Sequence, residues 1–148
     1  MPLTGEYEPS PAAWVREQVA DYEGSGGARA NTFRDTGLPV IIVTSRGRRS
    51  GKLRKWPVMR VEHEGQYALV ASKGGAPANP VWYGNLVADP RGVMIQDGPD
   101  PFDAEVRELS GEERETWWRR AVEAYPPYAE YQTKTDRLIP VLLASRRT

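Results

Sequence analysis

Residues 38–52 read LPVIIVTSRGRRSGK, an apolar β-branched run that passes directly into a basic turn. The run Leu38–Thr44 is dense in Val and Ile, which suits a buried β-strand. The segment Ser45–Lys52 that follows carries glycines at 47 and 51, and glycine favours a turn. This stretch therefore predicts a buried strand with a basic loop at its end.

Further strands are predicted on both sides of short turns such as Glu64-Gly65. Their ranges are Arg54–Glu62, Gln66–Ser72, Gly92–Gln96, Phe102–Leu109 and Ile139–Ala144. Short connections favour antiparallel neighbours, so the chain is predicted to be mostly β with helices, an α+β fold built on a small β-barrel. A length of 148 residues without internal repeats suits one domain, residues 1–148.

Helices are predicted at four places. Residues 1–27 form an N-terminal arm and helix, with Ser10 as N-cap, Pro11 at the first helical position, and a loose glycine-rich tether at 24–27. A short helix follows Asn79-Pro80 and stops before Asp89-Pro90. The sequence from Ser110 to Glu113 matches a capping box and opens a longer helix, which Pro126-Pro127 separates from a further helical turn.

Composition excludes several kinds of chemistry. The chain has no cysteine and one histidine, His63, which we expect to be exposed, so cysteine nucleophiles and multi-histidine metal sites are excluded. Twenty basic and twenty acidic residues give zero net charge, which implies no bulk attraction to nucleic acid. The N-terminus lacks a signal pattern and no apolar run is long enough to span a bilayer, so we expect a cytoplasmic protein.

Three segments carry candidate chemistry, and each has a plainer interpretation. Six of the twenty basic residues fall between positions 45 and 55, which suits a phosphate or carboxylate cradle or a solvated loop. Ser72-Lys73, beside two glycines, suits close approach of a planar or anionic ligand, or a plain connection. Tyr125, Tyr128 and Tyr131, spaced by three, form a hydrogen-bonding face or a core stripe. Residues 135–137 are interpreted as a structural ion pair or cap.

In this order, the segments resemble the deazaflavin-dependent nitroreductases, also called F420-dependent quinone reductases, of actinobacteria. The carrying pieces are VTSRGRRSG at 43–51, Arg54 with Pro57, ASKGGAP at 71–77, PVWY at 80–83 with Asn85-Leu86, Asp89-Pro90, YPPY at 125–128, Tyr131, and TDR at 135–137 with Ile139-Pro140. Trp56 and Gly84 depart from the family pattern, so we expect them to reshape the pocket.

The resemblance implies a split β-barrel related to FMN-binding barrels, with an N-terminal helix and covering helices, and a site for coenzyme F420 without a metal. The residues implied for the phosphate and acidic tail are Arg48, Arg49, Ser50, Arg54 and Lys55. Those implied for the deazaflavin and its linker are Ser72, Lys73, Ala76, Pro77, Trp82 and Tyr83. Pro57 is also implied as a cofactor-binding residue. The residues implied for catalysis at the acceptor pocket are Ser72, Tyr125, Tyr128 and Tyr131.

The function implied by the resemblance is hydride transfer from reduced F420 to an organic acceptor, namely a quinone, a nitroaromatic compound or an activated enone. Two alternatives stay open: a non-catalytic F420-binding carrier protein, and a split-barrel reductase that uses FMN. No nucleic-acid partner is expected. Stable membrane association is not expected either, although contact of the N-terminal helix with the inner membrane face stays open, as does the oligomeric state.

Overall fold

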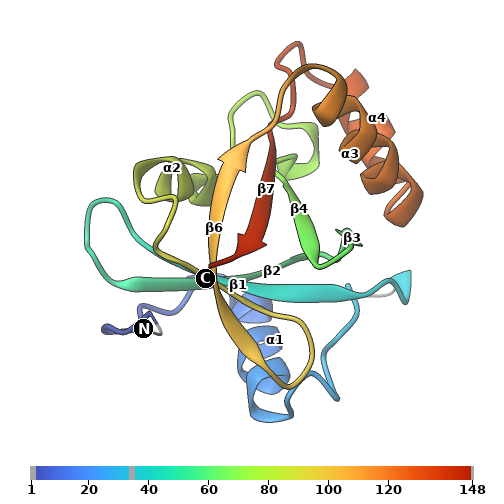
Figure 1. Ribbon diagram of the computed structural model, residues 1–148. Coiled ribbons are helices and arrows are strands. Elements are labelled where there is room, and N and C mark those ends of the chain that lie inside the picture. Colours follow the sequence, from blue (N-terminus) through green and yellow to red (C-terminus); the bar gives the residue numbers. More distant parts are fainter. Residues whose placement is uncertain (1–2, 34–35, 148) are drawn as a thin grey trace.

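The computed structural model describes residues 3–33 and 36–147. One seven-stranded sheet, in the order β2-β1-β5-β6-β7-β4-β3, curls into a half-barrel (Figure 1). Every strand pairing in it is antiparallel. The strands are β1 (Val40–Arg46), β2 (Leu53–Met59), β3 (Glu62–His63), β4 (Gln66–Val70), β5 (Val93–Gln96), β6 (Pro101–Glu108) and β7 (Val141–Arg146). The predicted split β-barrel with helices is confirmed.

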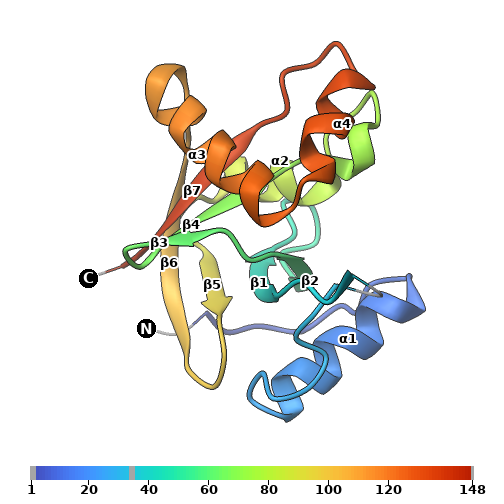
Figure 2. The same ribbon diagram turned by 90° about the vertical axis from the view of Figure 1, so that its right-hand side faces the viewer.

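Four α-helices and a short 3-10 turn complete the described part of the chain. They are α1 (Ala13–Gly24), the 3-10 turn η2 (Lys73–Gly75), α2 (Val81–Ala88), α3 (Gly111–Ala124) and α4 (Pro127–Thr133). In Figure 2, α1 lies at one end of the molecule and α3 and α4 at the other, with the strands between them. Within residues 3–33 and 36–147, none of the helices is long and apolar enough to cross a membrane.

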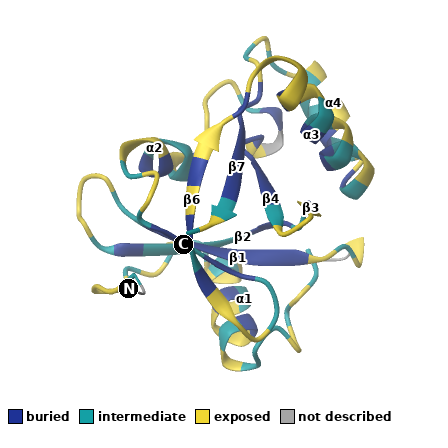
Figure 3. Cartoon of the chain, in the orientation of Figure 1, coloured by how far each residue is buried: buried dark blue, intermediate teal, exposed yellow. Residues whose placement is uncertain are grey.

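Strand β1 is buried on both faces, as its β-branched sequence predicts, and it is dark blue over most of its length in Figure 3. Because side chains alternate along a strand, Val40 and Ile42 enter one apolar cluster and Ile41 and Val43 enter another. The first cluster joins the sheet to α1, α3 and α4. The second fills the space beneath α2, where Leu86 is fully buried.

The sheet does not close on itself, because β2 and β3 are its two ends. The free edge of β2 is covered at its start by the N-terminal arm, where Leu53 exchanges backbone hydrogen bonds with Glu6 and Glu8 at 2.7 and 2.9 Å. Proline at position 57 suits an edge strand, because proline has no N–H to donate to a neighbour. The remainder of the β2 edge faces the gap between β2 and β4, two strands that are not hydrogen-bonded to each other. We call this gap the seam of the barrel.

The prediction that the first helix is loosely tethered is wrong. Val19 and Tyr22 are each only 1% exposed, which shows that α1 docks on the barrel. The Tyr22 hydroxyl accepts a hydrogen bond from the N–H of Gly98 at 2.8 Å and donates one to the carbonyl of Gln96 at 3.3 Å. The glycine-rich segment that follows α1 therefore packs closely against the turn between β5 and β6.

Both predicted helix caps differ from the structure. Helix α1 begins at Ala13 rather than at Pro11, because the Ser10 hydroxyl bonds the N–H of Ala12 ahead of the first helical turn. Ser110 does precede α3, but its side chain makes no capping hydrogen bond. The carboxylate of Glu113, which a capping box would turn back toward Ser110, is instead paired with Arg107 of β6.

The contact between Gly27 and Gly98 generates a prediction about stability. Gly27 has φ +81°, and a Cβ there would lie 2.8 Å from the Cα of Gly98. We expect Gly27→Ala to lower the free energy of unfolding by about 1–3 kcal/mol in denaturant titrations. Gly24→Ala is the matched control: a Cβ at Gly24 meets nothing within 4 Å, so its effect should stay within about 0.5 kcal/mol. Equal effects of the two substitutions would contradict this packing.

Candidate functional site

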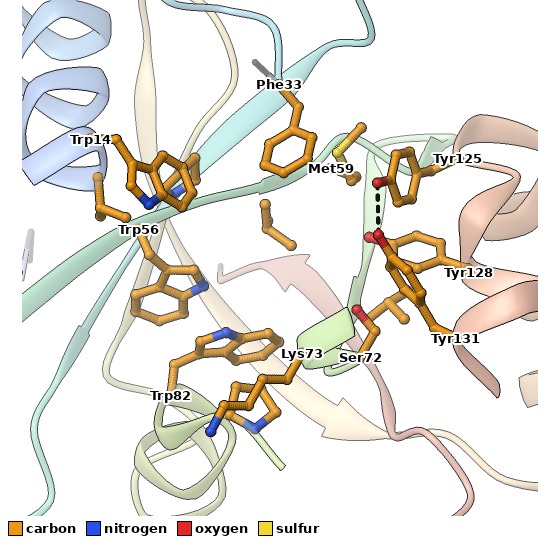
Figure 4. Close-up of a pocket in the computed structure, with 15 residues that line it drawn as sticks. Trp14, Phe33, Trp56, Met59, Ser72, Lys73, Trp82, Tyr125, Tyr128 and Tyr131 are labelled. Atoms are coloured by element: carbon orange, nitrogen blue, oxygen red, sulfur yellow. Dashed lines mark hydrogen bonds between the residues drawn. The ribbon is translucent and has the colours of Figure 1, made fainter. Parts of the chain in front are cut away.

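An aromatic chamber of about 370 Å³ occupies the seam beside β2 (Figure 4). Seven of the residues expected from the sequence line it: Pro57, Ser72, Lys73, Trp82, Tyr125, Tyr128 and Tyr131. Eight further residues line it, namely Trp14, Val15, Phe33, Trp56, Val58, Met59, Val70 and Pro80. Of these, Trp56 was expected to reshape the pocket, and the other seven were not expected at the site. The position of Trp56 two residues after Arg54 agrees with this placement, since residues i and i+2 of a strand share a face.

The three tyrosines share one wall of the chamber, as their spacing predicts. The hydroxyls of Tyr125 and Tyr131 are hydrogen-bonded at 2.9 Å, and the rings of Tyr125 and Tyr128 meet edge to face at 4.9 Å. Tyr128 is only 3% exposed. Burial, followed by the nearby Tyr125 and Tyr131, raises the pKa of Tyr128 well above its usual value. Tyr128 is therefore a neutral hydrogen-bond donor at any physiological pH.

The loop that carries Ser72 and Lys73 is fixed against α4. Ser72 is buried at the start of η2, whereas the side chain of Lys73 is exposed. Lys73 has φ +47°, a left-handed conformation that is uncommon for a residue with a side chain. At Gly75, a Cβ would lie 2.5 Å from the carbonyl oxygen of Tyr131, so only glycine allows this approach. The loop and the tyrosine wall thus form one packed unit.

Arg137 holds the same loop from the other side. Its guanidinium donates hydrogen bonds to the carbonyls of Ala71, Ser72 and Ala76 at 3.1, 2.6 and 2.8 Å, and to the side-chain oxygen of Asn79 at 2.8 Å. The interpretation of residues 135–137 as an ion pair or cap was therefore wrong for the Arg137 side chain. Backbone carbonyls, rather than a carboxylate, accept the hydrogen bonds of the Arg137 guanidinium. Burial lowers the pKa of Arg137, which still remains a cation.

A second pocket of about 360 Å³ lies at the end of the β1–β2 turn. It is lined by Gly47, Arg48, Arg49, Ser50 and Arg54, together with Glu8, Val81 and Asn85. The backbone N–H of Arg48 is held by the side-chain oxygen of the buried Asn85 at 3.1 Å. Its guanidinium rests on Gly84, where a Cβ would lie 2.8 Å from one Nη atom. Gly84 therefore makes room for this arginine.

The charge of this basic pocket is only partly balanced. Arg54 lies 3.4 Å from the carboxylate of Glu8. Within the described ranges, Arg48 and Arg49 form no ion pair. Two exposed guanidiniums beside turn amides and the Ser50 hydroxyl are well suited to bind phosphate or carboxylate groups.

Four residues expected at the site line neither pocket. Lys55 points to the opposite face of β2 from Arg54, and its ammonium lies 2.8 Å from the carboxylate of Glu23. The Tyr83 hydroxyl is bound by the carboxylate of Glu108, a hydrogen bond that raises the pKa of Tyr83 to about 12. Ala76 offers its carbonyl to Arg137, and Pro77 is exposed.

His63 is exposed, as expected. Throughout the part of the chain that the structure describes, no cluster of His, Asp and Glu side chains could hold a metal ion.

The chamber and the basic pocket adjoin along β2 and α2. Arg54 and Val81 line the basic pocket, whereas Trp56 and Trp82, on the same two elements, line the chamber. A ligand with a planar ring and an anionic tail would match this arrangement of an aromatic slot beside a cationic cradle.

The carbonyl contacts of Arg137 predict that lysine cannot replace it. Arg137→Lys loses the planar fork that reaches four acceptors, so we expect the free energy of unfolding to fall by about 1–3 kcal/mol. Amide hydrogen exchange at residues 71–79 should also accelerate. The control is Arg91→Lys at an exposed ion pair of 3.9 Å, which should change neither quantity. Unchanged exchange in Arg137→Lys would refute the role of this guanidinium.

Comparison with known proteins identifies the family. The model of the F420H(2)-dependent quinone reductase family matches residues 14–145. A putative F420H(2)-dependent quinone reductase of Mycobacterium tuberculosis is 34% identical over 110 residues, which cover 74% of this chain and 92% of that protein.

Two solved structures are also similar to this chain. The F420-H2 dependent reductase FDR-A is 59% identical, with a TM-score of 0.69 and coverage of 72% of this chain and 94% of that one. A protein described as a domain-swapped dimer is 53% identical, with a TM-score of 0.71 and coverage of 92% and 100%. The chain belongs to the F420H(2)-dependent quinone reductase family.

Proposed function

We propose that this chain is an F420H2-dependent quinone reductase whose two adjoining pockets hold one cofactor molecule. The observation that carries the proposal is the placement of the basic pocket directly beside the aromatic chamber. Arg48, Arg49, Ser50 and Arg54 would bind the phosphate and carboxylates of the F420 tail. The flat deazaflavin ring would lie in the chamber, against Trp82 and the loop that carries Ser72 and Lys73.

Reduced F420 supplies a hydride when it is bound. The chain would contribute orientation, exclusion of water and stabilisation of the charge that develops on the acceptor oxygen. The neutral Tyr128 phenol and the Ser72 hydroxyl line the chamber and can donate hydrogen bonds to that oxygen. The hydrogen-bonded hydroxyls of Tyr125 and the half-buried Tyr131 would provide a path for a proton from solvent.

The proposal extends to nitroaromatic compounds and activated enones as acceptors. Each is a small molecule with an electron-poor π-system, and each places negative charge on oxygen after it receives a hydride. The aromatic lining would bind such molecules through ring contacts, and the hydroxyl donors would act on all three classes. FMN is the weaker fit as a cofactor, because its single phosphate on a short chain would use less of the basic pocket.

The basic pocket predicts which cofactor binds. In a fluorescence titration with oxidised F420, Arg48→Ala combined with Arg49→Ala should weaken binding about a hundredfold or more, because two charge-assisted hydrogen bonds to the tail are lost. Arg91→Ala combined with Arg119→Ala removes the same charge from exposed sites outside both pockets and should leave binding unchanged. Tighter binding of FMN than of F420, or binding of neither, would overturn the cofactor assignment.

The tyrosine wall predicts a loss of turnover that is separate from cofactor binding. With menadione as acceptor, Tyr128→Phe should lower kcat about ten- to hundredfold, because the developing oxyanion loses a donor. Tyr131→Phe should also lower kcat. Affinity for F420 should change less than about twofold in both, since the tail contacts remain. Because the pKa of Tyr128 is raised above 10, turnover should show no loss between pH 7 and 9.5 from ionisation of this group.

Tyr7→Phe, outside both pockets, is the control for the tyrosine variants and should behave as the wild type. Unchanged turnover in both Tyr128→Phe and Tyr131→Phe would contradict the proposed roles. F420 binding without turnover of any acceptor in the wild-type protein would instead support the carrier function.

A further inference from the structure

Two tryptophans meet at the boundary between the chamber and the basic pocket. Trp56 of β2 and Trp82 of α2 stack with ring centroids 5.4 Å apart and planes 20° from parallel (Figure 4). Both indoles line the chamber, whereas Arg54, two residues before Trp56, and Val81, next to Trp82, line the basic pocket. A ligand that extends from the chamber to the basic pocket along β2 and α2 passes this pair.

The indole N–H of Trp56 donates no hydrogen bond to any described residue. Its Nε1 atom is buried, and no acceptor among the described residues lies within hydrogen-bond distance of it. Buried donors in native proteins are nearly always paired, so an unpaired one calls for an explanation. In this chain it belongs to one of the two stacked rings that line the chamber. A ligand oxygen or nitrogen that lay in the plane of the Trp56 indole would satisfy it.

We propose that the Trp56–Trp82 stack is a gate between the two pockets, and that Trp56 is a specificity-determining residue for ligands that join a planar ring to an anionic tail. Such a ligand separates the two indoles, and a polar atom of the chain that joins its ring to its tail, in the plane of the Trp56 indole, gives the Trp56 N–H an acceptor. This inference rests on the proposed function, because the F420 cofactor is the ligand that combines these two parts.

A ligand ring that enters between the two indoles requires the stack to open. A planar ring between two aromatic faces needs about 3.5 Å to each face, or about 7 Å in all, whereas the two indole centroids are 5.4 Å apart. Trp56 is held within β2, where it pairs with Val43 of the buried strand β1. Trp82 is the second residue of the eight-residue helix α2 and follows the loop around Pro80. Trp82 is therefore the partner that moves.

The gate also distinguishes the quinone acceptor from the F420 cofactor. A quinone has no anionic tail, so it enters the chamber without reaching the basic pocket and leaves the stack closed. The cofactor must open it. Opening of the stack is thus a signature of ligands that span both pockets, and it is independent of any hydride transfer.

Circular dichroism in the indole band tests the gate, because two stacked indoles couple and give a paired positive and negative signal. Within the described residues, Trp56 and Trp82 form the only stacked pair of tryptophans. Trp56→Phe and Trp82→Phe should therefore each remove the coupled signal. Trp118→Phe, which removes an indole that lines neither pocket, should retain it.

Saturation with oxidised F420 should abolish the coupled signal in the wild type and in Trp118→Phe. The F420-induced change should be missing from the two gate variants. Menadione alone should leave the signal intact. Trp56→Phe keeps an aromatic ring but lacks the N–H, so its dissociation constant for F420 should rise about fivefold.

Binding of F420 is followed separately through the fluorescence of the cofactor, which distinguishes failure of the gate from failure of the proposed function. A coupled signal that persists at F420 saturation would overturn the gate and leave the cofactor assignment intact. A signal lost with menadione alone would overturn the selectivity. Absence of F420 binding would overturn both.

Discussion

The open seam of the barrel is the constraint on which the rest of this structure depends. A sheet that ends at β2 and β3 leaves edges that must be covered, because unpaired strand edges invite association with other chains. The N-terminal arm covers the start of β2 through Leu53. Further along β2, helices α1, α2 and α4 surround the edge with aromatic side chains that leave a space beside it. The space that they leave is the chamber, bordered by residues from both faces of β2.

The walls of the chamber are rigid for identifiable reasons. Arg137 gathers three backbone carbonyls of the loop before α2, and Gly75 lets this loop pack directly on the backbone of α4. The tyrosines of α4 are in turn buried against the first apolar cluster. A shift of the loop before α2 would therefore displace the tyrosine hydroxyls of α4, because the two segments are packed against each other. The stacked indoles are only partly buried, which places the freedom to move at the junction of the two pockets.

Much of this could be predicted from the sequence, because the strands are short and strongly patterned. The buried strand before the basic turn and the shared face of the three tyrosines follow from residue types and spacing alone. The failures came from tertiary contacts. Glycines after α1 suggested a flexible tether, yet Gly27 is pressed against Gly98. Glu113 fits a capping box, yet Arg107 of the preceding strand β6 captures its carboxylate. Lys55 is a failure of another kind, because alternation along the predicted strand already places it on the opposite face from Arg54.

A crystal structure of the chain with oxidised F420 would show whether one F420 molecule bridges the two pockets. We expect the tail phosphate at Arg48 and Arg49, the deazaflavin ring in the chamber within reach of the Ser72 hydroxyl, and the indoles of Trp56 and Trp82 on separate sides of the cofactor. A ring bound outside the chamber, or a tail that leaves Arg48 and Arg49 in solvent, would contradict it.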